Sequence, residues 1–141
     1  DDARGSKAGD REDNNMIDAL VYARLIAHAP LLALVPIEQI NPVRPEPDSP
    51  QTELYYGLIA TDESLTLSGP TGPMKFTYSF DATDYDPSTV NAILDAVYAA
   101  FLGWHTSPVQ ACFQESRVLI PEEETGCFHG QIVFGIWHGL A

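Results

Sequence analysis

Residues 86–103 carry the start, the body and the stop of one amphipathic helix. Asp86 stands directly before Pro87, so its carboxylate can accept hydrogen bonds from free backbone N–H groups while proline occupies the first helical position. Apolar residues then recur at helical spacing up to Gly103, which favours a helix end: Val90, Ile93, Leu94, Val97, Tyr98 and Phe101. A stripe this wide has to be covered, so we expect the helix to pack across one face of a β-sheet.

Two strands are predicted before this helix. Residues 75–81 alternate, which predicts an inward row of Phe76, Tyr78 and Phe80 and a solvent-facing row of Lys75, Thr77, Ser79 and Asp81. Residues 54–61 are apolar on both faces, with Tyr56 and Leu58 opposite Tyr55 and Ile59, which predicts a strand covered on both sides. The turn-rich residues 65–73 between the strands predict a protruding loop.

The last third of the chain predicts a β-hairpin of residues 109–120 and 127–138, joined by an acidic loop. Val109, Ala111 and Phe113 share one parity, whereas Val118 and Ile120 share the other, so we expect a β-bulge that restores one inward face. Cys112 and Cys127 would then lie roughly 23 Å apart at ~3.3 Å per residue. A disulfide cannot span that distance, so both thiols are expected to be reduced.

The N-terminal part predicts two helices and a connector. Ile17, Leu20, Val21 and Leu25 form the stripe of a helix that runs to about His28, and Pro30 suits the first turn of a short second helix through Leu34. Five prolines between Pro36 and Pro50 exclude a helix and a central strand, which predicts an extended connector. We favour a covering loop over a proline-rich segment that binds a partner.

Residues 1–15 hold eight charged residues and two apolar ones, Ala3 and Ala8, so burial cannot order them. We expect a flexible N-terminal arm, or one that becomes ordered against a neighbour, and Met16 could be an original start. Residues 16–141 are predicted to form one α+β domain. Its core elements are a mainly antiparallel four-stranded sheet, the long helix packed on one face, and the N-terminal helix.

Charge limits the partners of this chain. Twenty acidic and seven basic residues give a formal net charge of −13, which opposes direct binding to nucleic acid or to an anionic membrane. DNA could still pass nearby, because a like-charged wall lets a duplex slide whereas a basic wall would hold it. No apolar run approaches the ~18 residues of a membrane span, and no secretory signal pattern is present, so we expect a soluble protein.

No residue pattern predicts catalysis or a cofactor. The four histidines (His28, His105, His129 and His138) lack the close spacing of a zinc motif, and Cys127 with His129 supplies two ligands only. No nucleophile elbow surrounds a serine, and neither Gly69 nor Gly72 begins a phosphate-binding loop. We therefore predict that the protein is not an enzyme and has no catalytic, cofactor-binding or metal-ligating residue.

The joint order of these segments resembles the tail-terminator, or tail-completion, family of long-tailed bacteriophages. Residues 67–82 (LSGPTGPMKFTYSFDA) look like the family's loop and strand, and residues 91–104 (NAILDAVYAAFLGW) look like its helix. The stretch 117–138 (RVLIPEEETGCFHGQIVFGIWH) is similar to its final hairpin. The resemblance covers residues 16–139, whereas the N-terminal arm and the proline-rich connector depart from the family pattern.

The resemblance implies a structural virion protein, assembled in the host bacterial cytoplasm and placed at the head-proximal end of the tail. Six copies would form a ring that caps the tail tube protein, ends tail polymerisation and offers a joining surface to a head-connector or stopper protein. The alternatives are another neck protein, such as a head-completion or stopper protein, and, less favoured, a small ligand-binding domain or enzyme.

Two sets of residues would carry the work of such a ring. The candidate subunit interface is Tyr55, Leu65, Leu67 and Pro70. The candidate lumen acids, past which DNA would move without specific binding, are Asp62, Glu63, Glu122, Glu123 and Glu124.

Overall fold

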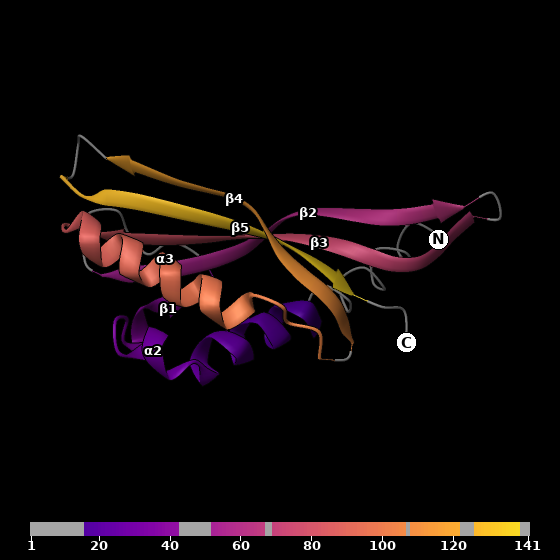
Figure 1. Cartoon of the computed structure of the whole chain (residues 1–141), viewed down its shortest axis with the longest axis horizontal. Coiled ribbons are helices and arrows are strands. Elements are labelled where there is room, and N and C mark those ends of the chain that lie inside the picture. Colours follow the sequence, from indigo (N-terminus) through magenta and orange to yellow (C-terminus); the bar gives the residue numbers. More distant parts are fainter. Residues whose placement is uncertain (1–15, 43–51, 67–68, 107, 122–125, 139–141) are drawn as a thin grey trace, which may run out of the picture.

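The computed structural model describes residues 16–42, 52–66, 69–106, 108–121 and 126–138 (Figure 1). The chain forms one five-stranded sheet in the order β1-β2-β3-β5-β4. β1 is parallel to β2, and every other neighbouring pair is antiparallel. The helices lie on one side of the sheet (Figure 1). This arrangement confirms the predicted α+β class and mainly antiparallel sheet, and it adds a short fifth strand.

The elements follow one another in chain order. A helix over residues 16–27 precedes α2 (Ala29–Leu32), the 3-10 helix η1 (Ile37–Gln39) and β1 (Ile40–Asn41). The long strands β2 (Glu53–Thr66) and β3 (Gly69–Asp84) come next, followed by α3 (Pro87–Phe101). β4 (Val109–Pro121) and β5 (Phe128–His138) complete the sheet. Within the described ranges, no helix is long and apolar enough to cross a membrane.

α3 forms as its local signals predict. The Asp86 carboxylate accepts a hydrogen bond of 2.9 Å from the Ser88 backbone N–H, and Gly103 adopts a φ of 71° beyond the last turn. Tyr98 departs from the predicted stripe, since 36% of its surface is exposed. The rest of the stripe is buried on the inner face of the sheet: Val90, Ile93, Leu94, Val97 and Phe101.

The hydrophobic core lies between the sheet and the helical layer. Phe76, Tyr78 and Phe80 of β3 are fully buried, which confirms the predicted inward row. The ring of Phe80 lies 4.8 Å from that of Phe101 and 6.0 Å from that of Phe134, measured between centroids. The buried residues of the first helix complete the core and confirm that helix: Ile17, Val21 and Leu25.

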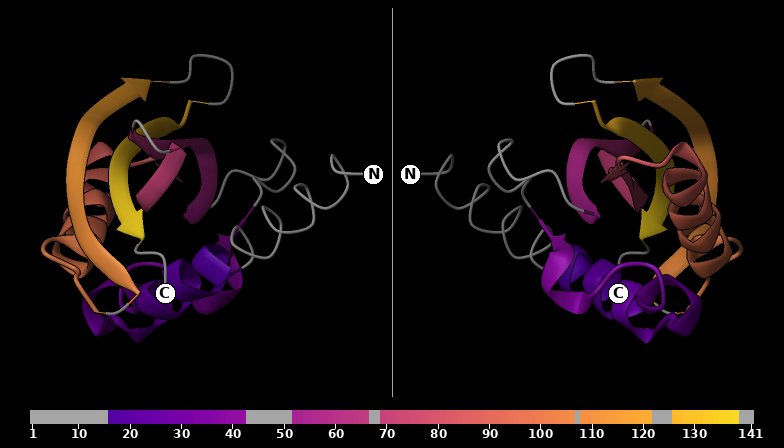
Figure 2. Two further views of the ribbon diagram at one scale, coloured as in Figure 1. Left: turned by 90° about the vertical axis from the view of Figure 1, so that its right-hand side faces the viewer. Right: turned by 90° about the vertical axis from the view of Figure 1, so that its left-hand side faces the viewer.

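The outer row of β3 does not face solvent, contrary to the prediction. Thr77, Ser79 and Asp81 expose only 7%, 4% and 7% of their surfaces. The sheet is strongly curled when it is viewed end-on (Figure 2), and the side chains of Tyr55 and His129 meet from the strands on either side of β3. Alternation separated the two rows correctly, but it could not show that both rows are buried.

β4 contains two β-bulges, between Val109 and Ala111 and between Gln114 and Ser116. The second confirms the predicted irregularity and brings three apolar side chains to one face: Phe113, Val118 and Ile120. That face is the outer one, because the strand partners of Val118 and Ile120 are residues 131 and 129 of β5, whose side chains join the outer polar cluster. The predicted inward orientation is therefore wrong. Cys112 is buried towards the core instead, and neither it nor Cys127 forms a disulfide, as expected.

Residues 65–66 and 69–73 belong to strands, which corrects the predicted loop for these residues. Leu65 pairs with Pro70 and Thr66 pairs with Gly69, so β2 and β3 form a hairpin arm that extends beyond the helical layer (Figure 1). The last described pair between β5 and β3 is His138 with Met74, so no described strand pairs with the β5 side of β3 before Met74. Prolines fit there because they interrupt no described hydrogen-bond ladder. The predicted cover on both faces of β2 is also wrong for Ile59, which is 59% exposed.

The proline-rich connector begins with ordered structure. Residues 37–41 form η1 and β1, and β1 pairs with Leu54 and Tyr55 of β2. The predicted extended connector is therefore wrong for the 3-10 turn, whereas β1 is extended but is paired at the edge of the sheet. A single 3-10 turn and a two-residue edge strand both tolerate flanking prolines, because neither needs a long hydrogen-bond ladder. The predictions for residues 1–15 and 43–51 lie outside the described residues.

Candidate functional site

The candidate interface residues fall at two places on β2 and β3. Tyr55 is half-buried near the start of β2, where its hydroxyl oxygen lies 3.2 Å from His129 Nε2. Leu65 and Pro70 are partners across the far end of the hairpin arm. Leu67 lies outside the described residues. The structure thus brings Leu65 and Pro70 together and separates both from Tyr55.

The candidate lumen acids form two groups along the chain. Asp62 is exposed on β2 and pairs with Lys75, and Glu63 pairs with Met74. Glu122, Glu123 and Glu124 lie outside the described residues, but they follow Pro121, which pairs with Phe128. Phe128 in turn pairs with Asp84, ten positions along β3 from Met74. At about 3.3 Å per residue, the two acidic groups attach to the sheet about 33 Å apart.

A polar cluster occupies the outer face of the sheet at β2, β3 and β5. His129 Nε2 lies 2.7 Å from Asp81 Oδ1, and Gln131 Nε2 donates to the same oxygen at 3.2 Å. Gln131 also donates to Ser79 Oγ at 3.0 Å, and Ser79 Oγ donates to the second Asp81 oxygen at 2.5 Å. With Tyr55, these side chains form a continuous network that joins three neighbouring strands.

The hydrogen bonds of this cluster hold neighbouring strands together. The Asp81 carboxylate accepts hydrogen bonds from Ser79 and Gln131 and lies beside His129 Nε2. These partners compensate its charge although the side chain is buried. The Ser79 hydroxyl points its proton at Asp81 and is not set up as a nucleophile against His129. Sequence reasoning missed the cluster, because the register of three strands had to be known before Asp81, His129 and Gln131 could be placed together.

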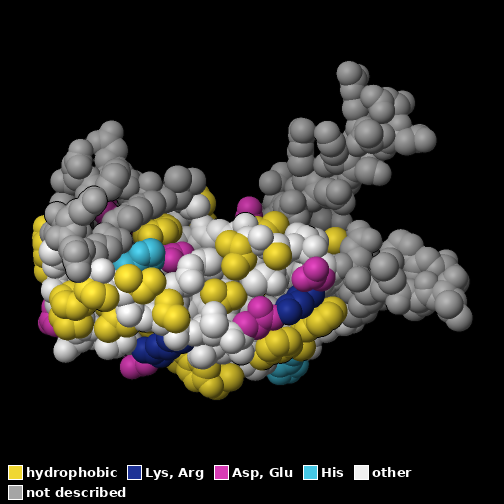
Figure 3. All heavy atoms as spheres, turned by 90° about the horizontal axis from the view of Figure 1, so that it is seen from above, with side chains coloured by type: hydrophobic (Ala, Val, Ile, Leu, Met, Phe, Trp, Pro, Cys, Tyr) yellow, Lys and Arg dark blue, Asp and Glu magenta, His cyan; other side chains and the backbone are white. Residues whose placement is uncertain are grey.

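An outer apolar strip follows β4, and we define it as Phe113, Val118 and Ile120. These side chains expose 43%, 45% and 51% of their surfaces. Figure 3 looks onto the outer face of the sheet, where hydrophobic side chains stand exposed among polar ones. The partners of Phe113 and Val118 lie four positions apart along β5, and the exposed Glu115 and Ser116 lie between them, so polar side chains interrupt the strip.

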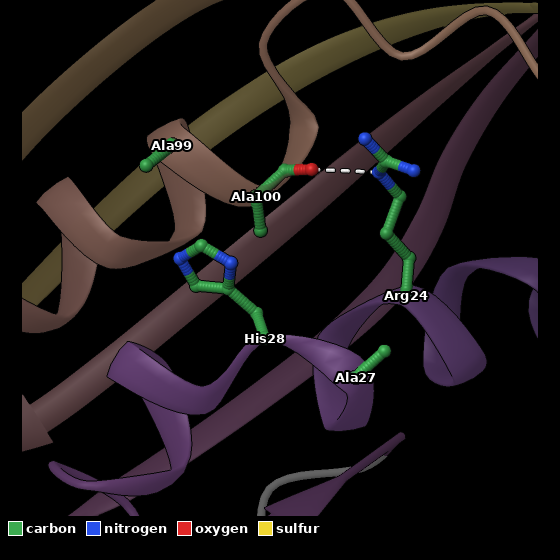
Figure 4. Close-up of a pocket in the computed structure, with 5 residues that line it drawn as sticks. All are labelled: Arg24, Ala27, His28, Ala99 and Ala100. Atoms are coloured by element: carbon green, nitrogen blue, oxygen red, sulfur yellow. Dashed lines mark hydrogen bonds between the residues drawn. The ribbon is translucent and has the colours of Figure 1, made fainter.

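A shallow hollow separates the first helix from the end of α3. Its lining residues are Arg24, Ala27, His28, Ala99 and Ala100. Arg24 Nε donates to the Ala100 carbonyl at 2.6 Å (Figure 4). The guanidinium carbon of Arg24 lies 5.0 Å from the centroid of the Trp104 ring. His28 Nε2 is buried and has no hydrogen-bond partner in the described part of the chain. Arg24 therefore caps the C-terminal end of α3, where a cation is favoured by the helix dipole.

Burial shifts the ionisation of groups near the hollow and under the sheet. Desolvation lowers the pKa of Arg24, and it raises the pKa of the Cys112 thiol to about 12. Desolvation also raises the pKa of Tyr78 far above its ordinary range, reinforced by the hydrogen bond from its hydroxyl to Asp18. All three groups keep their usual forms at neutral pH, so they contribute to packing and not to proton transfer.

No group of three His, Cys, Asp or Glu side chains that could hold a metal ion occurs among the residues the structure describes. Cys127 and His129, which the sequence places on the same strand, are no exception. His129 is instead engaged with Asp81 and Tyr55.

No protein-family model matches the sequence, and no curated protein matches it in sequence. Among solved structures, the chain is similar to one from the virion of a native gene transfer agent particle, with a TM-score of 0.66 and 20% identity. The similarity covers 85% of this chain and 92% of that chain, so the two share a fold over nearly their whole lengths. A protein from Akkermansia muciniphila, solved without its transmembrane region, gives a TM-score of 0.29 at 13% identity, covering 60% and 45% of the chains. That value is too low to carry an argument.

Proposed function

We propose that this chain is a structural subunit of a phage-like virion, and specifically a tail terminator. Several copies, six by the resemblance, form a ring on the head-proximal end of the tail tube. The ring ends tail polymerisation and presents a surface to the head connector. Its work is binding, not catalysis.

The observation that carries this proposal is the fold shared with a chain of the gene transfer agent virion. That likeness extends over 85% of this chain and 92% of the other, so it concerns a whole subunit and not a common motif. The order of helix, strand pair, capped helix and hairpin along the sequence also resembles the tail-terminator family.

Charge supports a channel through which DNA passes. The net charge of −13 opposes a grip on DNA, and Asp62 is exposed on the hairpin arm. If the strands run along the ring axis, Asp62 and Glu63 belong towards one mouth of the channel. Glu122, Glu123 and Glu124 then belong towards the other mouth, so the acids form two separate rings of charge.

The proposal is tested by inactivating the reading frame in its native phage or prophage and viewing the induced lysate by negative-stain electron microscopy. Filled heads beside unattached tails of unregulated length are the expected result. Complementation with the wild-type gene restores joined particles and serves as the control.

The same images discriminate the second candidate, another neck protein such as a head-completion or stopper protein. Tails of normal length beside leaking heads would move the chain to the head side of the neck. Intact infectious particles would refute both roles.

A further inference from the structure

Both margins of the sheet are open among the described residues. β4 lies at one end of the strand order and pairs with β5 alone. At the other end, β1 pairs only with Leu54 and Tyr55, so the rest of β2 has no partner on that side within the described ranges. A strand margin of this length presents a row of backbone N–H and C=O groups that can pair with another chain.

Apart from its two β-bulges, β4 lacks the features that usually protect an open margin. Its only two charged residues, Glu115 and Arg117, are already compensated within the subunit: Glu115 pairs with Lys75, and Arg117 Nη1 lies 2.8 Å from Asp95 Oδ1. No proline interrupts the strand before Pro121. Natural edge strands are instead commonly blunted by free charges or by prolines. β4 therefore offers backbone groups and apolar side chains without an unpaired charge to bury.

β2 carries apolar residues at the position across the sheet that corresponds to Phe113 of β4. Following partners across the sheet, Ala60 pairs with Thr77, Thr77 with Gly135, and Gly135 with Phe113. Ile59 is the unpaired residue of the β2 bulge beside Ala60, and it is 59% exposed. The 43% exposed Phe113 on one margin thus lies level with Ile59 and Ala60 on the other.

Strand direction also allows the two margins to join. β2, β3, β5 and β4 alternate in direction, so β4 runs opposite to β2. Rotation about a ring axis preserves each strand's direction along that axis. The β2 strand of a neighbouring copy would therefore continue the alternation and meet β4 in the antiparallel sense.

We propose that copies of this chain join by pairing residues 109–117 of β4 with residues 56–63 of β2 in the next copy. The contact is head-to-tail, so repeated rotation closes a ring with one continuous sheet. This inference rests on the proposed ring and names the surfaces that build it. In this register Arg117 of β4 is opposite Tyr56 of the next copy's β2. Tyr56 is one residue beyond the last residue that pairs with β1, so β4 and β1 do not compete for the same part of β2.

Cross-linking in assembled particles tests this pairing. The double variant Ala60→Cys with Phe113→Cys is introduced into the native gene, and purified particles are treated with a short bismaleimide. We expect a ladder of covalent multimers that ends at the closed ring. The single variants are matched controls, and they should remain monomeric because Cys112 and Cys127 are buried.

Two results would overturn the pairing and leave the proposed function standing. One is a chain that is present in joined particles but gives no ladder in the double variant. The other is efficient dimer formation by Phe113→Cys alone, which would indicate two-fold β4–β4 contact. Absence of the chain from all particles would instead refute the proposed function itself.

A charge variant supplies the second readout. Phe113→Lys should prevent the joining of phage heads to tails in a complementation assay, whereas Leu102→Lys, on the exposed turn after α3, should not. Far-UV circular dichroism and the urea midpoint of both purified chains should match those of the wild type. Joining that is unaffected by Phe113→Lys would contradict the assignment of this margin.

Discussion

Gly130 sets how closely α3 approaches the sheet. A Cβ atom placed on Gly130 would lie 2.5 Å from Val90 Cγ1 and 2.7 Å from Leu94 Cδ1. Both neighbours are fully buried residues of α3, so neither side chain can turn towards solvent. Gly130→Ala must therefore push the helix away from β5 or force its side chains out of their rotamers.

The expected cost follows from these contacts. Overpacking of a core by one methyl group costs about 1–3 kcal/mol, and loss of glycine freedom in the unfolded chain returns about 0.4–1 kcal/mol. We expect Gly130→Ala to lower the free energy of unfolding by about 1–2 kcal/mol. That is a large share of the ~5–15 kcal/mol that stabilises a typical domain. Urea denaturation followed by circular dichroism measures the change as a lower midpoint at constant slope.

Two other strand glycines are matched controls. Gly57→Ala meets no atom within 4 Å, so it should leave the midpoint unchanged or raise it slightly. Gly135→Ala would approach Glu115 Oε1 and Lys75 Cε at 2.8 Å, but both are the far ends of flexible side chains, so its cost should be intermediate. A Gly130→Ala variant as stable as Gly57→Ala would refute the packing of α3 over β5.

Three further predictions concern the core and its caps. Phe101→Ala should cost ~3 kcal/mol or more, since its fully buried ring contacts Phe80, Phe134 and Trp104; an unchanged urea midpoint would contradict the helix assignment. Asp86→Ala should cost ~1 kcal/mol by removing the cap on Ser88, whereas Asp86→Asn should retain most of it. Burial raises the pKa of Cys112 to about 12, so the folded chain keeps a proton that the unfolded chain releases above a pKa of about 9. Stability should then fall as pH rises between those values, and Cys112→Ala should flatten the fall in urea titrations.

The sequence predicted those elements whose signals are local. The α3 helix needed only the Asp86-Pro87 start, the apolar period and Gly103, all of which act within a few residues. The inward row of β3 followed from alternation in the same way. The class and the antiparallel hairpins could be assembled from such elements, because short connections favour adjacent pairing.

Features that depend on contacts between distant residues were missed or wrong. The burial of Ser79 and Asp81 depends on strands that begin far away in the sequence, and the outward orientation of Val118 depends on where the bulges fall. The outer polar cluster required the register of three strands. The hairpin arm was taken for a loop because its prolines and glycines signal turns locally, whereas an open margin tolerates them.

The proposed edge pairing and the proposed lumen acids together predict which side of the sheet faces the channel. In a ring with one continuous sheet, the helical layer lies either wholly outside or wholly inside. Asp62 is the strand partner of Lys75, so both side chains lie on the outer face of the sheet. Leu102 follows α3 and belongs to the helical layer on the other face. Asp62 can reach the channel only if the helices face outward.

Labelling of assembled particles distinguishes the two arrangements. With the helices outside, Leu102→Cys should react with a bulky polymer maleimide, and Asp62→Cys should react with a small maleimide but be shielded from the bulky one. Both positions are exposed in the single chain, so both variants should react fully with either reagent before assembly, which is the control. The reverse pattern would place the helices in the channel. It would refute the lumen role of Asp62 while leaving the pairing of β4 with β2 intact, because that pairing is the same for either direction of curvature.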